Sequence, residues 1–230
     1  MNEGFTTLEV WRRGPVGWLV FDRPGVGNAV DATMFAELER AWAELDADPE
    51  VRVVVNTGNG DAFQTGLDVR QLATDRDALR EQSRRTRDFA LRMTAWHCDV
   101  WKPVIAAVNG VCAGAGLHFV ADADIVIASS DATFLDPHVS VGQVSAIETI
   151  GIIRKSPMEP VTRMALMGRH ERMTADRARQ LGILSEVVDP PAALRDRAQE
   201  LAETIAQRPS EELAALKRAL WSALDHSRGE

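Results

Sequence analysis

The sequence predicts an α/β protein with an α-helical C-terminal region. Three apolar stretches each run into a turn of small residues, in the segments VVVNTGNG, VIAAVNG and DIVIASS. Helical patterns separate and follow these stretches, and strands that alternate with helices are typical of an α/β core. Because the three segments are unequally spaced, they indicate a weak internal repeat rather than a solenoid.

Composition narrows the class of protein. A chain of 230 residues fits one domain, or one domain with a small appendage, and can bury its own core. The formal net charge of −8 argues against a nucleic-acid-binding surface. The two cysteines match neither a disulfide framework nor a zinc motif. The N-terminus does not resemble a signal peptide, and the apolar stretch 104–121 is interrupted by Asn109 and His118, so we expect a soluble, cytoplasmic protein without a membrane span.

The N-terminal third is expected to contain a hairpin, a helix and a strand. Apolar residues alternate on both sides of a turn at 13–15, which predicts the hairpin. Asp31 is a suitable N-cap for a helix that ends near 48–49, because the apolar residues after it recur at helical spacing. A short buried strand is predicted from Val51 to Val55.

The remaining elements follow from charge and apolar spacing. The charged stretch 73–95 predicts a long, solvated helix. Two more buried strands are expected at 104–108 and 125–128, with a small-residue turn and a helix over 117–121 between them. The predicted C-terminal helices lie around 161–167, 175–181, 192–206 and 210–224.

Two glycine-containing turns carry the chemical signal, AFQTGLD at 62–68 and NGVCAGAGLHF at 109–119. Their small residues allow the backbone to approach a ligand closely. Two backbone N–H groups that converge on one point form an oxyanion hole, although tight packing of a helix on a strand would also explain the glycines. Neither turn is a dinucleotide-binding or a phosphate-binding loop, since the required spacing of glycine and lysine is absent.

Longer segments carry a family resemblance. NAVDATMFAELERAWAELDADPEVRVVVNTGNGDAFQTGLDVRQL resembles the N-terminal half of a crotonase, KPVIAAVNGVCAGAGLHFVADADIVIAS resembles its second oxyanion loop, and RMALMGRHERMTADRARQLGILSEVVD continues the likeness. The chain is therefore identified as a member of the crotonase (enoyl-CoA hydratase/isomerase) superfamily over roughly residues 8 to 220. The resemblance implies a crotonase-like ββα superhelix over 1–190. It also implies a C-terminal helical segment over 191–230 that is shorter than usual for the family.

The resemblance also implies site residues. The backbone N–H groups of Leu67 and Ala115 would form the oxyanion hole for a thioester carbonyl. The two glutamates of a typical hydratase are replaced by His118 in GLHF and His138 in DPHV, and Glu148 lies near a further family position for a carboxylate. The positions that would contact substrate or coenzyme A are Arg23, Asn28, Ala29, Val30, Gly66, Asp68 and Gly114.

Each of these side chains has a structural alternative. A neutral imidazole is a competent base, but a histidine on a helix is often only a hydrogen-bonded structural residue. Glu148 is equally well explained as a solvated helix residue, and Arg23 as a surface charge. No metal site is expected, because His118 and His138 lack a third ligand at a suitable spacing. Three further histidines without a motif are interpreted as surface or structural residues: His97, His170 and His226.

The leading functional hypothesis is an enzyme of the enoyl-CoA hydratase/isomerase type that stabilises a thioester enolate. Its partner would be an acyl-CoA thioester, with coenzyme A only as part of the substrate, and the chain would assemble as a homotrimer or hexamer. Two alternatives remain. One is a hydrolase that breaks the C–C bond of a β-dicarbonyl compound, and the other is a non-catalytic scaffold that binds acyl-CoA.

Overall fold

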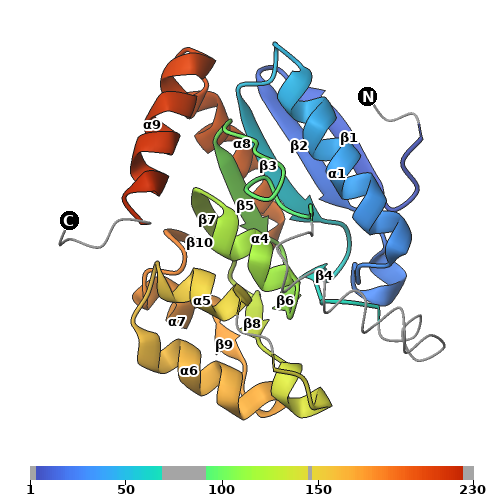
Figure 1. Cartoon of the computed structure of the whole chain (residues 1–230), viewed down its shortest axis with the longest axis vertical. Helices are drawn as coiled ribbons and strands as arrows, with labels where there is room; N and C mark the ends of the chain where they lie inside the picture. Colours follow the sequence, from blue (N-terminus) through green and yellow to red (C-terminus); the bar gives the residue numbers. More distant parts are fainter. Residues whose placement is uncertain (1–3, 69–91, 145–146, 225–230) are drawn as a thin grey trace.

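A computed structural model of the chain describes residues 4–68, 92–144 and 147–224, which form two β-sheets and a set of covering helices (Figure 1). The first sheet has the strand order β1-β2-β3-β5-β7-β10. Strands β1 and β2 are antiparallel, and the later strands are added in parallel. The bounds of these strands are β1 Leu8–Arg13, β2 Val16–Phe21, β3 Val53–Gly58, β5 Val104–Val108, β7 Ile125–Ser129 and β10 Glu186–Val188.

The second sheet is smaller and has the order β4-β6-β8-β9. Its strands are only two or three residues long: β4 Ala62–Gln64, β6 Val111–Ala113, β8 Thr133–Leu135 and β9 Met173–Thr174. Each of the first three follows directly after β3, β5 or β7, so the chain passes from the first sheet to the second three times. The turns of small residues that the sequence repeats are these crossings.

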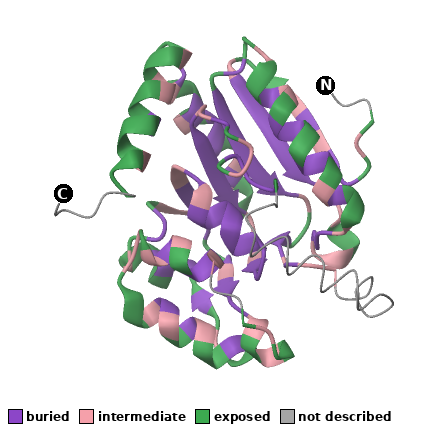
Figure 2. Ribbon diagram, in the orientation of Figure 1, coloured by how far each residue is buried: buried purple, intermediate pink, exposed green. Residues whose placement is uncertain are grey.

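Helices cover both faces of the first sheet. On one face, helix α1 (Ala32–Ala47) packs with β1 and β2 in the larger hydrophobic core. On the other face, α8 (Leu194–Ile205) packs on alternate residues of β2, β3, β5 and β7 in a second core. All six residues of β2 are therefore buried, and the central strands are purple in Figure 2. Burial on both faces explains why these strands read as continuous apolar runs.

The remaining helices around the second sheet are α4 Gly116–Asp122, α5 Ile147–Ile153, α6 Met158–Met167 and α7 Ala175–Gln180 (Figure 1). Helix α9 (Ser210–Ser222) lies apart from that sheet and leads to the C-terminus. Short 3₁₀ turns occur at η1 Pro24–Val26, η2 His138–Val141, η3 Gly168–His170 and η4 Pro191–Ala193. Within the described ranges, no helix is long and apolar enough to cross a bilayer.

The predicted fold class is confirmed, with local differences in the elements. Asp31 caps α1 as expected, because its side chain accepts a hydrogen bond of 2.8 Å from the N–H of Met34. The strand expected from Val51 begins at Val53 instead, since the Val51 N–H bonds back to Asp48 in the turn after α1. The expected helix over 73–95 lies mostly outside the described residues. The prediction is wrong for 92–95, where an irregular segment leads into a bend at Thr94 and a turn that starts at Ala95. The boundary at 190/191 stays a prediction.

Candidate active site

The two glycine turns meet backbone to backbone. Gly66 and Gly114 have φ angles of +100° and +52°, in the left-handed region that favours glycine. A methyl group added to Gly114 would lie 3.5 Å from the Cα atom of Gly66. A methyl group added to Gly66 would lie 3.6 Å from the amide nitrogen of Ala115. A Cβ atom would thus meet only ordinary van der Waals contacts, and it is the left-handed backbone at both positions that favours glycine.

The amides of Leu67 and Ala115 flank this contact. Leu67 forms a parallel bridge with Val30, in which the neighbouring Gly66 and Asp68 make the two hydrogen bonds, each of 2.8 Å. In such a bridge the N–H of Leu67 itself points away from Val30. Among residues 4–68, 92–144 and 147–224, no protein acceptor is recorded for the N–H of Leu67 or of Ala115. Both amides are thus available to a ligand oxygen.

Gln64 shapes the first turn, a role that the sequence did not reveal. Its side chain is fully buried, and its Oε1 accepts the Gly66 N–H at 2.9 Å while its Nε2 donates to the Gly66 carbonyl at 3.2 Å. These two bonds fix the peptide groups on both sides of Gly66, so Gln64 is a positioning residue for the Leu67 amide.

The structure brings His118, His138 and Glu148 together. Oε1 of Glu148 lies 3.3 Å from Nε2 of His118 and 3.8 Å from Nε2 of His138. Both His118 and Glu148 have side chains only 4% exposed, so the alternative of a solvated Glu148 is wrong. Cε1 of His138 would lie 3.8 Å from a methyl group on Gly114, which places its ring beside the second glycine turn.

Asp136 completes this group and was missed by the sequence analysis, although it lies only two residues before His138. Its Oδ1 is 2.6 Å from Nδ1 of His138 and also accepts the His138 backbone N–H at 3.1 Å. Burial by itself would lower the pKa of His138, but the hydrogen bond that its ring donates to Asp136 and the charges of Glu148 and Asp136 raise that pKa above its ordinary value. Because a carboxylate only accepts, the Nδ1 carries the proton and a neutral ring has its lone pair on Nε2.

The residues predicted to contact coenzyme A form a network among themselves. Arg23 lies 3.0 Å from Asp68 and 3.2 Å from Asp31, and it donates to the Ala29 carbonyl. Arg23 is therefore a paired, mostly buried cation rather than a solvated surface charge. The fully buried Asn28 side chain donates to carbonyls of the β3–β4 segment and accepts the Arg23 N–H at 2.8 Å. The Asn28 N–H also donates to the Arg23 carbonyl at 3.0 Å, so the backbone carbonyl of Asn28 is the group left to contact a ligand.

Comparisons with known proteins agree with this geometry. The profile of the family Enoyl-CoA hydratase/isomerase matches residues 12–230. The chain belongs to the enoyl-CoA hydratase/isomerase family. It is 34% identical over 215 residues to the (E)-benzylidenesuccinyl-CoA hydratase of Thauera aromatica, covering 93% of this chain and 80% of that protein. It is also 33% identical over 218 residues to the carnitinyl-CoA dehydratase of Citrobacter koseri, covering 92% and 78%.

A solved structure supports the same assignment. An enoyl-CoA hydratase/isomerase from Mycobacterium paratuberculosis superimposes with a TM-score of 0.82 at 36% identity, covering 97% of this chain and 85% of the other. The predicted crotonase fold is thereby confirmed, and the chain is an enzyme of the enoyl-CoA hydratase/isomerase type. The roles of individual side chains stay predictions.

Among the other histidines, which were expected to be surface or structural residues, His97 is buried rather than on the surface. Its side chain is only 8% exposed, and its ring meets the His118 ring edge to face with centroids 5.6 Å apart. Burial lowers the pKa of His97, and the negative charge of Asp122 offsets part of this lowering. His170 is exposed, and His226 lies outside the described residues.

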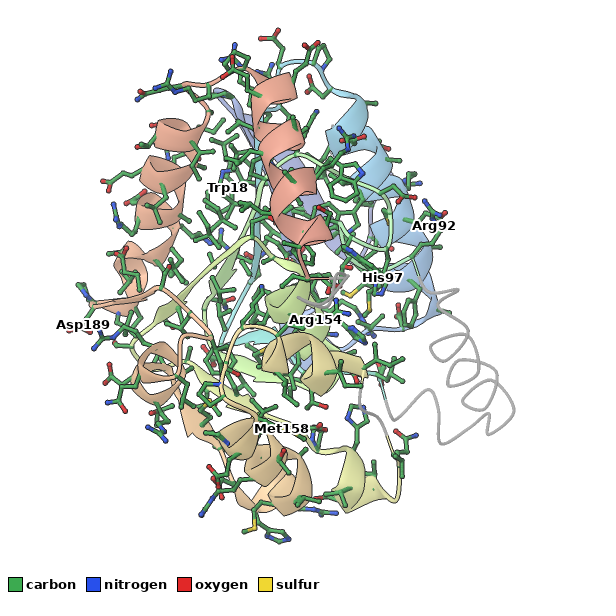
Figure 3. All side chains as sticks on the ribbon, turned by 60° about the vertical axis from the view of Figure 1, so that its left-hand side comes forward. Trp18, Arg92, His97, Arg154, Met158 and Asp189 are labelled. Carbon is green, nitrogen blue, oxygen red and sulfur yellow. The ribbon has the colours of Figure 1, made fainter. Side chains whose placement is uncertain are left out.

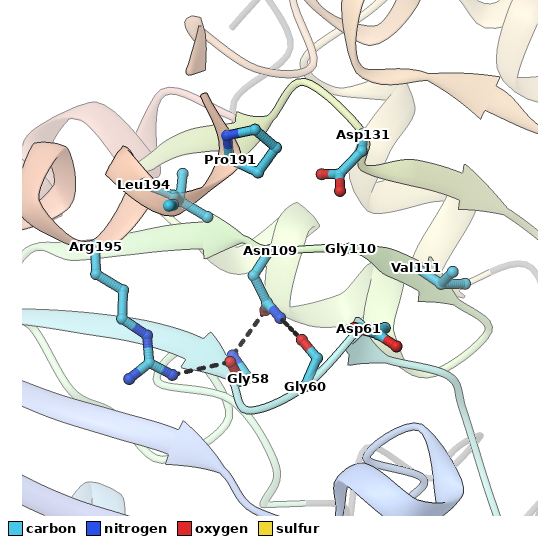
Figure 4. A pocket seen from close by; sticks show the side chains of 11 residues that line it. Gly58, Gly60, Asp61, Asn109, Gly110, Val111, Asp131, Pro191, Leu194 and Arg195 are labelled. Atoms are coloured by element: carbon cyan, nitrogen blue, oxygen red, sulfur yellow. Dashed lines mark hydrogen bonds between the residues drawn. The ribbon is translucent and has the colours of Figure 1, made fainter. Parts of the chain in front are cut away.

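A separate pocket lies at the carboxyl ends of β3 and β5 (Figure 4). It has a volume of about 450 Å³ and is walled by Asn109, Asp131 and Arg195 among others. None of the site residues predicted from the sequence lines this pocket. Arg195 donates to the Gly58 carbonyl at 3.0 Å. Asn109 accepts the Gly58 N–H and donates to the Gly60 carbonyl. The polar groups of this pocket therefore hold the strand ends together.

Proposed function

We propose that this chain binds an acyl-CoA thioester with its carbonyl oxygen between the N–H groups of Leu67 and Ala115. Both amides lack a protein acceptor in the described ranges and flank the contact of Gly66 with Gly114. Negative charge on that oxygen grows as an enolate forms, so the two donors stabilise the enolate more than the neutral thioester. The Arg23–Asp68 ion pair, next to Leu67 in the first glycine turn, would border the coenzyme A moiety.

The observation that carries the acid–base part is the buried carboxylate of Glu148 between two imidazoles, beside the second glycine turn. Asp136 orients His138 so that Nε2 is the free basic atom. We assign His138 as the base, with His118 and Glu148 as the pair that holds and returns a proton. Histidines would thus replace the two glutamates of a typical hydratase.

The reaction class that we propose is reversible hydration of a 2,3-unsaturated acyl-CoA. His138 takes a proton from water as the oxygen attacks the β-carbon, and the electron pair moves into the thioester as an enolate. The protonated His118–Glu148 pair gives a proton to the α-carbon, and the proton held by His138 then passes to the pair through Glu148, which restores both groups. Dehydration is the reverse. The names of the two curated relatives, a hydratase and a dehydratase, support this direction of chemistry.

Deuterium exchange tests the proposal. The protein is incubated in heavy water with saturated and unsaturated acyl-CoAs, and uptake at the α-carbon is followed by mass spectrometry. We expect uptake and hydration in the wild type, with His138→Ala and His118→Ala slower by about 10²- to 10⁴-fold. His170→Ala, which removes an exposed histidine, is the matched control and should keep the wild-type rate. Binding of acyl-CoA without any uptake would overturn the proposal in favour of a non-catalytic scaffold.

A second candidate is hydrolysis of the C–C bond of a β-dicarbonyl compound. The 2.6 Å contact of Asp136 with His138 favours it, because such a pair activates water as a nucleophile. Water would then attack one carbonyl, and the C–C bond would break to leave a carboxylic acid and a ketone enolate. Cleavage of a β-diketone that lacks coenzyme A, without hydration of any enoyl-CoA, would select this candidate.

Two further expectations accompany the proposal. Assembly as a homotrimer or hexamer stays a prediction, which light scattering on the eluted protein checks. A cytoplasmic location also stays a prediction, which fractionation of the source cells checks.

A further inference from the structure

A set of metal-ligating side chains adjoins the active site on the far side of His118. One ring nitrogen of His97, one of His118 and one carboxylate oxygen of Asp122 lie within 4.8 Å of one another. His118 and Asp122 are four positions apart on α4, so they share one face of that helix. His97 reaches the same point from the turn that precedes β5. Their side chains are 8%, 4% and 17% exposed in the order His97, His118 and Asp122.

We propose that His97, His118 and Asp122 form a binding site for Zn²⁺. Two nitrogens and one carboxylate oxygen, with an open position for water, are a ligand set that Zn²⁺ accepts in tetrahedral geometry. Ligand atoms on one tetrahedral zinc ion lie about 3.4 Å apart. Nδ1 of His97 and Oδ2 of Asp122 are 3.9 Å apart, so small side-chain rotations close the site.

The surroundings hold the ligands as zinc sites commonly do. The hydroxyl of Thr94 lies 2.6 Å from Oδ2 of Asp122 and 2.8 Å from Nδ1 of His97, and it keeps these side chains together. Glu148 contacts Nε2 of His118 at 3.3 Å. With its Nε2 held by a carboxylate, His118 has Nδ1 left for the ion, the arrangement that orients metal-ligating histidines through their second nitrogen. Nδ1 of His97 would exchange its hydrogen bond with Thr94 for the ion.

A cavity gives the ion access and space. It has a volume of about 140 Å³, larger than the roughly 30 Å³ that one water molecule occupies. Its walls include Trp96, Ile150 and Trp221, whose apolar surfaces strengthen charge interactions by excluding water. Arg154 borders the cavity and Lys155 interacts with Asp122, so two cations oppose the ion and the carboxylates of Asp122 and Glu148 offset them. Figure 3 shows His97 and Arg154 on neighbouring segments of this region.

One consequence rests on the proposed function. His118 cannot both ligate Zn²⁺ and accept a proton, so bound Zn²⁺ would inhibit hydration. Zinc binding without inhibition would contradict the acid–base role of His118 and leave the metal site standing. Hydration by a chain that binds no zinc would leave the proposed function standing and overturn the site.

The test uses the full chain after treatment with a chelator. Co²⁺ is titrated as a spectroscopic probe, and Zn²⁺ binding is measured by calorimetry. We expect one ion per chain and a visible absorption band typical of low-coordinate Co²⁺. Asp122→Asn and His97→Gln should weaken binding by at least about 100-fold, and Thr94→Val by about 10- to 100-fold.

His138→Ala is the matched control, because it removes another histidine, half-buried and with a carboxylate partner, but none of the three ligands. It should keep the affinity for Zn²⁺ within about threefold, and circular dichroism checks that every variant is folded. Equal affinities of wild type, Asp122→Asn and His97→Gln would overturn the site. So would a loss of binding in His138→Ala as large as in the ligand variants.

Discussion

Replacement of Asp136 by asparagine tests whether an oriented His138 is the base. Asp136 is 1% exposed and holds His138 by two hydrogen bonds, of 2.6 Å to the ring and 3.1 Å to the backbone. Asparagine keeps the shape but removes the charge, and its amide nitrogen can present a donor to Nδ1, which places the proton on Nε2. We expect kcat to fall by about 10²- to 10⁴-fold, equivalent to about 2.7–5.4 kcal/mol in activation free energy.

The pH profile gives this prediction a direction. The charge and hydrogen bond of Asp136 raise the pKa of His138 in the folded enzyme despite its burial. A base must be unprotonated, so activity falls as pH drops through this pKa, and Asp136→Asn should shift the acid limb to lower pH. The stability from this pair is fully present below the unfolded pKa of about 6.5 and is lost as pH rises through the folded-state pKa. The variant should therefore lose more stability at acidic than at alkaline pH.

The assay is initial-rate hydration of an enoyl-CoA across the pH range, with urea unfolding of the same variants. Asp131→Asn removes the charge of an exposed aspartate five residues before Asp136 and serves as the control. An Asp136→Asn enzyme with a rate within threefold of the wild type, or with an unmoved acid limb, would refute the assignment of His138 as the base.

Three other substitutions, one of them with a control variant, test the glycine turn, a buried carboxylate of α1 and the Asn28 hydrogen bonds. Gly114→Ala forces a non-glycine residue to φ +52°, so it should cost about 1–2 kcal/mol of stability and also slow hydration. Its control, Gly14→Ala at φ +58° in the hairpin turn, should lower stability without slowing hydration. Urea unfolding and hydration rates of both variants check these expectations. Glu37→Gln should destabilise by about 1.5–3 kcal/mol, because burial opposes ionisation of Glu37 but four hydrogen bonds from two threonines lower its pKa. That stability is present above pH 4.5 and is lost as pH falls through the folded-state pKa, so the wild type and Glu37→Gln should converge in acid. Asn28→Ala removes the donor to the carbonyls of Asn59, Ala62 and Phe63, of which Ala62 keeps a bond from Asn109, and should cost about 2–4 kcal/mol in urea unfolding. A loss below 1 kcal/mol would contradict the hydrogen bonds described for Asn28.

The sequence by itself determined the order of the main elements. The apolar runs of β3, β5 and β7 and the cap at Asp31 are local signals, since a strand buried on both faces and a helix N-terminus each have their own residue pattern. The glycines of the two turns were also visible, because a left-handed backbone and a close approach both exclude a Cβ atom.

Only the tertiary structure decided which side chains act together. The strands of the second sheet are too short to show a period, so their positions depend on pairing with residues distant in the chain. Glu148 is far from His118 in sequence, and only the packing of α5 on α4 places its carboxylate between two imidazoles. His97 meets Asp122 because the turn before β5 packs against α4. Contacts of this kind depend on where elements pack rather than on spacing within any one of them.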